Sequence, residues 1–416
     1  MSMAAQGSVT RAQLAGRLQG RVPAGRVGPA VPRALPAGEP EHSAGPAAGA
    51  PTSISVQMTR RATLGAAAGA VPAIGLLNSL AVPSAEANTV LSNEWELVDL
   101  PIDPAVVLLD IFMKDDKNGF LVGTRQTLLR TTDGGNTWEK LSVPALAEEG
   151  FNYRFNSVSF IGDEGWIVGK PAVLLHTTDG GATWDRVPLS SKLPGVPMHI
   201  YSTGKGEAEM VTDQGAIYVT GDVGATWKAQ VQETVDATLN RTVSSGISGA
   251  SYYEGTFSNV ARNDDGSYVA VSSRGNFFMT WAPGETYWQP HNRPMTRRVQ
   301  TMGYSPEGKL WLTTRGGDVL FADSPGVTEA FSQSKLGSRG FGVLDVGFRP
   351  ASQDVFACGG SGTLLKSKDG GKTFKRDRSA DTVPANLYEV RFFSPKCGFI
   401  LGNNAKVMRF IGGGSA

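Results

Sequence analysis

One short motif recurs along the chain and constrains its fold more than any other feature. The pattern is Ser/Thr-x-Asp-x-Gly-x-Thr-aromatic, as in TTDGGNTW at 131–138 and TTDGGATW at 177–184. It occurs four times, and its aspartates, spaced 46, 43 and 147 residues apart, are Asp133, Asp179, Asp222 and Asp369. The last interval has room for more copies, and two degenerate ones lie inside it, at 280–288 and 321–331. The chain is therefore built from repeats of 41 to 46 residues.

Each repeat also contains short apolar runs bounded by Gly, Asn or Asp, as in GFLVGTRQTLL at 119–129. Such runs are typical of short antiparallel strands, and about four of them per repeat predict a β-propeller. Seven copies can be found, and the last ends at Ile411 without a final strand. NEWELVDL at 93–100 resembles NTWEKLSV at 136–143 and can supply that strand. The sequence therefore predicts an all-β, seven-bladed β-propeller, closed by the N-terminal strand of the mature chain.

In such a blade the recurring motif falls between the third and fourth strands. The Asp is placed to accept backbone N–H groups, the Gly residues suit positive φ, and the aromatic residue suits packing between blades. Four aspartates in separate blades cannot converge on one catalytic or metal centre. We therefore predict that this motif, an Asp-box, has a structural role.

The N-terminal region reads as targeting sequence. Residues 1–55 are rich in Ala, Gly, Pro and Arg, which suits a chloroplast transit peptide, although a disordered tail has a similar composition. In 56–87 the pair Arg60-Arg61 precedes an apolar run and a small-x-small site at 85–87, as in a twin-arginine signal. A bacterial periplasmic protein would need only the second signal. Together the two predict delivery to the thylakoid lumen, with the propeller at 88–416.

The overall composition excludes some functions. From residue 88 onward there are 32 Lys and Arg against 35 Asp and Glu, which argues against general nucleic-acid binding. Histidine is scarce and the two cysteines, Cys358 and Cys397, form no CxxC motif, so we expect no metal site and no cofactor. A disulfide between them is possible in an oxidising compartment but not favoured, because they fall at different strand positions.

Arginines gather at positions that a propeller would bring to one face. Eight residues before each motif Asp lies the turn between the second and third strands, which carries Arg125, Arg274 and Arg315. The connections between blades open on the same face and add Arg241, Arg293, Arg297, Arg298 and Arg339. Arginine pairs bidentately with carboxylates, so these positions predict a docking face for an acidic partner. Some of them could instead pair with Asp318 or Glu285.

The connection at 239–257 is longer than the others, and Arg241, Tyr252 and Tyr253 lie in it or beside it. Loops of this length in compact domains are usually functional or disordered. The segment could therefore contribute contact residues or be a passive insertion.

Several strings are more specific than the Asp-boxes, notably TVSSGISGASYY, YWQPHNRPMTRRVQTMGY and RGFGVLDVGFR. They resemble the photosystem II stability/assembly factor family of chloroplasts and cyanobacteria, over essentially the whole of 88–412. The resemblance implies a non-catalytic lumenal propeller, peripheral to the membrane through its partner proteins. It also implies that the chain binds newly made D1 and assists its assembly with D2 and cytochrome b559. The arginine patch of the family corresponds to Arg274, Arg293, Arg297, Arg298, Arg315 and Arg339.

A sialidase-like glycosidase or a carbohydrate-binding propeller is the alternative, because Asp-boxes and clustered arginines also occur in sialidases. Such an enzyme needs a Tyr nucleophile, a Glu base and an acidic proton donor. Tyr252, Tyr253 and Glu254 would have to take these roles, and the Arg-Ile-Pro signature of sialidases is absent.

Overall fold

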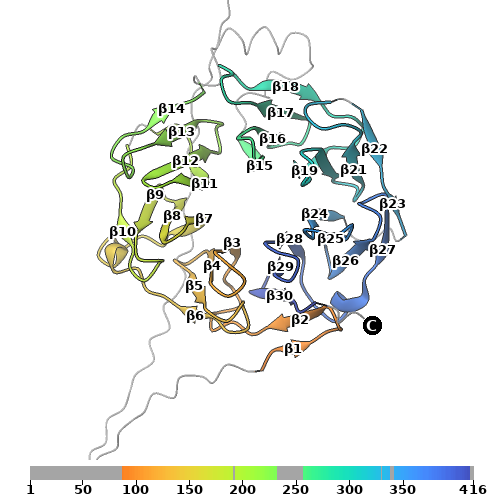
Figure 1. Ribbon diagram of the computed structural model, residues 1–416, viewed down its shortest axis with the longest axis horizontal. Coiled ribbons are helices and arrows are strands. Elements are labelled where there is room, and N and C mark those ends of the chain that lie inside the picture. The colour runs from red at the N-terminus through yellow and green to blue at the C-terminus, as the bar shows by residue number, and fades with distance from the viewer. Residues whose placement is uncertain (1–86, 191–192, 232–255, 329, 338–341, 413–416) are drawn as a thin grey trace, which may run out of the picture. The chain divides into compact units, whose positions relative to one another are not determined.

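The computed structural model describes residues 87–190, 193–231, 256–328, 330–337 and 342–412. The predicted leader (1–55 and 56–87) lies almost entirely outside the described residues. In the described part, seven antiparallel sheets stand side by side around a common axis (Figure 1). The predicted seven-bladed propeller is confirmed.

The strands follow the chain blade by blade. Blade 1 holds β3 (Leu108–Met113), β4 (Gly119–Gly123), β5 (Leu128–Thr131) and β6 (Glu139–Lys140); blade 2 holds β7 (Arg154–Ile161), β8 (Glu164–Lys170), β9 (Val173–Thr177) and β10 (Asp185–Arg186). Blade 3 holds β11 (Pro197–Gly204), β12 (Glu207–Thr212), β13 (Ile217–Thr220) and β14 (Lys228–Ala229); blade 4 holds β15 (Phe257–Arg262), β16 (Tyr268–Ser272), β17 (Phe277–Trp281) and β18 (Gln289–Asn292).

Blade 5 holds β19 (Val299–Tyr304), β20 (Leu310–Thr314), β21 (Val319–Ala322) and β22 (Phe331–Gln333); blade 6 holds β24 (Val343–Phe348), β25 (Val355–Gly359), β26 (Thr363–Ser367) and β27 (Thr373–Arg376), with β23 (Lys335–Leu336) parallel to β27. Blade 7 holds β28 (Leu387–Phe392), β29 (Gly398–Gly402) and β30 (Lys406–Phe410). Two short 3-10 helices, η1 (Pro144–Leu146) and η3 (Arg378–Ala380), lie outside the blades. Among the described residues, no helix has the length and apolar character needed to cross a bilayer.

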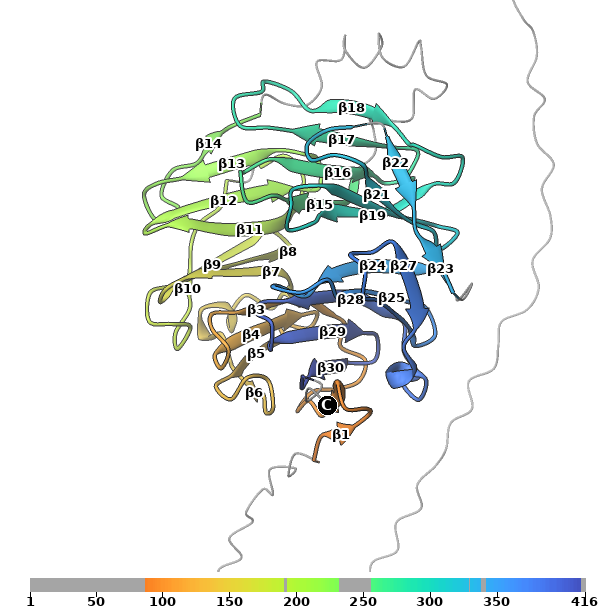
Figure 2. The same ribbon diagram turned by 45° about the vertical axis from the view of Figure 1, so that its right-hand side comes forward.

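The N-terminal strand completes blade 7, as predicted. β2 (Trp95–Val98) pairs antiparallel with β30, with Trp95 opposite Phe410, and β1 (Thr89–Val90) adds a further strand outside it. Figure 2 shows the N-terminal segment and the C-terminal strand β30 next to each other. Because the last blade takes strands from both ends, the ring has no unpaired seam between its first and last repeats.

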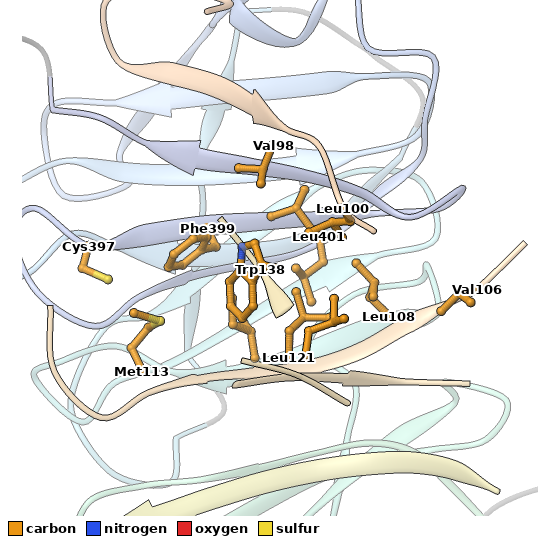
Figure 3. Packing of buried hydrophobic residues seen from close by; sticks show 13 residues of the cluster. Val98, Leu100, Val106, Leu108, Met113, Leu121, Trp138, Cys397, Phe399 and Leu401 are labelled. Carbon is orange, nitrogen blue, oxygen red and sulfur yellow. The ribbon is translucent and has the colours of Figure 1, made fainter. Parts of the chain in front are cut away.

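The core consists of layers between neighbouring blades. Trp138, the aromatic residue of the first Asp-box, packs with Leu108 and Leu121 of blade 1 and with Phe399 and Leu401 of blade 7 (Figure 3). Its ring and that of Phe399 meet edge to face, with centroids 6.2 Å apart. An aromatic residue at this position therefore joins one blade to the previous one, which explains why an aromatic recurs there.

The innermost strand of every blade has the same irregularity. β3, β7, β11, β15, β19, β24 and β28 surround the axis in Figure 1, and each has a register shift near its start. The residue just after the shift is polar in all seven blades. We call these residues the bulge ring: Asp110, Ser157, His199, Asn259, Thr301, Asp345 and Glu389.

Candidate docking face

The topology gives the ring two different faces. The turns between the first and second strands and those between the third and fourth strands open on one face, which carries the Asp-boxes. The turns between the second and third strands and the connections between blades open on the other. The turns between the second and third strands carry Arg125, Arg274 and Arg315. The connection between β18 and β19 carries Arg293, Arg297 and Arg298. All six therefore belong to the face opposite the Asp-boxes.

Hydrogen bonds bring arginines from adjacent loops together over blades 4 and 5. The Arg315 N–H donates to the carbonyl oxygen of Arg298 at 2.9 Å. The Arg315 guanidinium (Nη2) reaches the carbonyl oxygen of Ser273 at 3.4 Å, directly beside Arg274. Arg274, Arg298 and Arg315 are all exposed. Three loops that are separate in sequence thus place exposed arginines close together on one face.

A glycine lets Arg297 join this surface. A Cβ added to Gly316 would lie 2.5 Å from Nη1 of Arg297, so the arginine crosses the blade 5 turn where no side chain blocks it. There Nη1 donates to Oδ2 of Asp318 at 2.8 Å. Asp318 is itself held by the Thr314 hydroxyl at 2.7 Å and by the Gln333 amide at 3.0 Å. A fixed carboxylate therefore orients Arg297, whose side chain stays 56% exposed.

Glu285, one of the two acids with which these arginines could have paired, does not lie on their face of the ring. Glu285 lies in the turn between β17 and β18, on the opposite face, and its Oε2 accepts the Ala282 N–H at 3.0 Å. Its carboxylate is thus used within the turn itself, where Ala282 stands at the position of the Asp-box aspartate. The alternating direction of the strands separates it from the arginines.

The remaining predicted residues are less central. Arg293 begins the connection between β18 and β19 and is half-buried. Arg125 lies on blade 1, across the ring from blades 4 and 5 (Figure 1), and its Nη1 is 2.8 Å from Oδ2 of Asp103. Arg241 and Arg339, like Tyr252 and Tyr253, lie outside the described residues.

The four Asp-boxes share one local geometry on the other face. Asp369 is representative: Oδ1 accepts the Ser367 hydroxyl at 2.7 Å and the Thr373 N–H at 2.9 Å, while Oδ2 accepts the Thr373 hydroxyl at 2.6 Å. Hydrogen bonds from the Thr373 and Ser367 hydroxyls and the Thr373 N–H lower the pKa of Asp369 to about 2. Equivalent bonds hold the other three aspartates, Asp133, Asp179 and Asp222. Both carboxylate oxygens are thus used within the turn itself.

The two degenerate copies lie at the corresponding connections between the third and fourth strands of their blades. The segment 280–288 connects β17 to β18, and its Trp288 is buried with Nε1 donating to the Gly215 carbonyl at 2.8 Å. In the fifth blade the Gly326 N–H donates to Gly308 at 3.3 Å, as the Gly134 N–H does to Lys117 in the first. The repeat period that exposed these copies therefore corresponds to a real structural period.

Sequence reasoning missed the bulge ring. Its members recur at one strand position, so a polar residue at a fixed place in the first apolar run of each repeat was the available signal. Several of them accept a backbone N–H from the next blade: Asp110 from Val158 and Asn259 from Met302, both at 2.9 Å. They therefore connect neighbouring blades around the axis.

No metal centre is evident in the described ranges, where no group of three or more His, Cys, Asp or Glu side chains is arranged to hold an ion. Cys358 and Cys397 are buried free thiols in separate core clusters. The charged residues that the fold gathers on one exposed face are arginines, which cannot bind a metal ion.

Fold and surface together define the class: an Asp-box β-propeller that presents clustered arginines on the face opposite its Asp-boxes. The chain belongs to the photosystem II assembly factor YCF48 family, whose model matches residues 87–411. It is 55% identical over 342 residues to the chloroplastic photosystem II stability/assembly factor HCF136 of Arabidopsis thaliana, covering 82% of this chain and 84% of that protein.

Two solved structures agree with this assignment. YCF48 from Cyanidioschyzon merolae is 45% identical, with a TM-score of 0.68, covering 76% of this chain and 98% of that one. A structure described as YCF48 bound to D1 peptide is 41% identical, with a TM-score of 0.67, covering 79% of this chain and all of that one. The resemblance seen in the sequence is confirmed. The family is one of non-enzymatic assembly factors, which argues against the sialidase-like alternative.

Proposed function

We propose that this chain binds the newly made D1 subunit in the thylakoid lumen and assists its early assembly with D2 and cytochrome b559. The docking site is the arginine-rich face over blades 4 and 5, made by Arg274, Arg293, Arg297, Arg298 and Arg315. Arg241 and Arg339, which lie outside the described residues, belong to this proposal on the sequence alone, and Arg125 contributes to the same face from blade 1.

The convergence of Arg298 and Arg315 carries this proposal. Their backbone contact of 2.9 Å fixes two loops against each other, so the points from which these two side chains extend are set before any partner arrives. Preorganised donors lose less entropy on binding than flexible ones, and arginine forks match carboxylates in geometry. The relative whose solved structure holds a D1 peptide supports D1 as the partner.

Charge reversal tests the docking site. The variant R297E/R298E should lose binding to D1 precursor and to D1-derived peptides, measured by calorimetry, while keeping its thermal unfolding midpoint. K368E/K372E reverses two exposed charges on the opposite face and is the matched control, which should keep its binding. R125E reverses one charge on the same face but on blade 1, with a smaller expected loss. Wild-type affinity in R297E/R298E would exclude blades 4 and 5 as the docking site.

Delivery to the lumen is a separate part of the proposal. It rests on the Arg60-Arg61 pair and on relatives that are chloroplastic proteins. In an import assay with isolated chloroplasts, R60K/R61K should enter the organelle but stop before the lumen. Lumenal arrival of that variant would show that the twin-arginine pathway is not used.

A further inference from the structure

Blade 7 is held to both of its neighbours by charged groups of the inner wall. On one side, Asp345 of blade 6 accepts the Val390 N–H through Oδ2 at 2.9 Å. On the other, Arg391 donates through Nη1 to Oδ1 of Asp110 at 2.7 Å and to the Ile111 carbonyl at 2.8 Å, both in blade 1. These contacts flank the one blade that is assembled from the two ends of the propeller chain.

The carboxylates outnumber the cation at this place. Arg391 also lies 2.8 Å (Nη2 to Oε1) from Glu389, so Asp110 and Glu389 share one guanidinium. Asp345 makes no ion pair with Arg391, but it lies near enough for its charge to act on Glu389. Asp110 has two N–H donors of its own, from Ile111 and Val158, each at 2.9 Å. When all three acids are ionised, two negative charges are left without a matching cation among side chains that are only partly exposed to water, which is costly.

Burial raises the pKa of Asp345 to about 7, against the hydrogen bonds from Val390 and Val346 and the attraction of Arg391. Burial likewise raises the pKa of Glu389 to about 8, where repulsion from Asp110 and Asp345 opposes the attraction of Arg391. The other titratable or polar groups that face this cluster from neighbouring strands are His199, Tyr201, Thr301, Cys358 and Tyr388.

We infer that Asp345 and Glu389 form a proton-binding pair which makes the attachment of blade 7 to blades 6 and 1 firmer as the pH falls. Protonation removes the charges that Arg391 cannot compensate, while a neutral Asp345 still accepts the Val390 N–H through its carboxyl oxygen. The seam that closes the ring thereby responds to the pH of its compartment. This inference does not depend on the arginine face or on the identity of the partner.

The direction follows from linkage. An acid whose pKa is higher in the folded state binds more protons when folded, so its contribution to stability grows as the pH falls through that pKa. The effect levels off near the pKa of the unfolded chain, about 4. His199 acts in the opposite sense below about 6.5, because burial lowers its pKa and keeps it neutral. The window in which the carboxyl pair dominates is therefore pH 6.5 to 8.

Urea unfolding of the purified protein across this window tests the inference. The unfolding equilibrium constant of the wild type should rise about tenfold per pH unit for each proton released. The variant D345N/E389Q, which is neutral at both positions, should lose most of that slope. The matched control D264N/E148Q removes two exposed acids and should keep the wild-type slope. Equal slopes in the wild type and D345N/E389Q would overturn the inference.

A second measurement decides the case if D345N/E389Q does not fold. Infrared difference spectra of the wild type between pH 6.5 and 8 should show the carbonyl band of a protonated buried carboxyl group appearing at the lower pH. The single variant E389Q should weaken that band. A wild-type spectrum in which every carboxyl group is already ionised at pH 6.5 would overturn the inference without any variant.

Discussion

Arg297 and Asp318 form an ion pair of 2.8 Å between Nη1 and Oδ2, which joins the connection after blade 4 to the turn of blade 5. The carboxylate is 14% exposed, whereas the arginine is 56% exposed. The arginine-rich face therefore contains an internal acid that orients one arginine and would compete for it with the proposed partner.

Replacing this acid should strengthen binding. We expect D318N to bind a D1 peptide about two- to fivefold more tightly at low salt, because an exposed ion pair is worth under about 1 kcal/mol and Arg297 is released. The gain should shrink at high ionic strength. Calorimetry at two salt concentrations measures it, with D323N on the opposite face as control. Weaker binding by D318N would show instead that the orientation of Arg297 matters more than its charge.

Removing an Asp-box carboxylate should destabilise the propeller without affecting docking. D369A loses the bonds from Ser367 and Thr373, and we expect a decrease of about 1–2 kcal/mol in the free energy of unfolding. K368A, at the exposed neighbouring position, is the control. Thermal unfolding measures stability and calorimetry measures binding; loss of peptide binding in folded D369A would contradict a purely structural role.

The carboxylate of Asp369 should also make the stability of the protein depend on pH under acid conditions. The pKa of Asp369 is lowered to about 2, so its contribution is complete above the unfolded-state value near 4 and is lost as the pH falls toward 2. The difference in stability between the wild type and D369A should therefore narrow between pH 4 and pH 2. A constant difference over that range, measured by urea unfolding, would contradict this assignment.

Closure of the ring should depend on Trp95. This residue is fully buried, and its ring meets those of Phe410 and Phe356 edge to face at 5.2 and 5.4 Å. We expect W95A to lower the free energy of unfolding by about 3–5 kcal/mol, since it leaves a cavity where β2 joins β30. W95F should cost less, because it keeps an aromatic ring. Urea unfolding measures both, and a small loss in W95A would show that β2 contributes little to closure.

The two cysteines should be unreactive in the native protein. Both are buried, and burial raises the pKa of the Cys397 thiol to about 12, so little nucleophilic thiolate is present. A thiol reagent at pH 8 should label neither residue until the protein is unfolded, and then label both. Mass spectrometry of non-reduced peptides provides the check, and a cross-link between Cys358 and Cys397 would contradict the prediction.

The sequence alone determined the architecture. Four Asp-boxes with a regular spacing established the repeat, and the match between the segments around Trp95 and Trp138 predicted how the ring closes. Both signals are local, because each turn must supply its own hydrogen bonds and each strand its own apolar residues. Local requirements of this kind recur in each blade and can therefore be recognised in the amino-acid sequence.

Only the tertiary structure showed which side chains meet. It placed Asp318 against Arg297 but Glu285 on the other face, and it brought Arg391 between Asp110 and Glu389, about 280 residues apart in sequence. Closing the ring sets the first blade against the last, so distant polar residues become neighbours. The burial of these residues and the charges around them depend on ring closure, and the repeat pattern of the sequence does not show which residues it brings together.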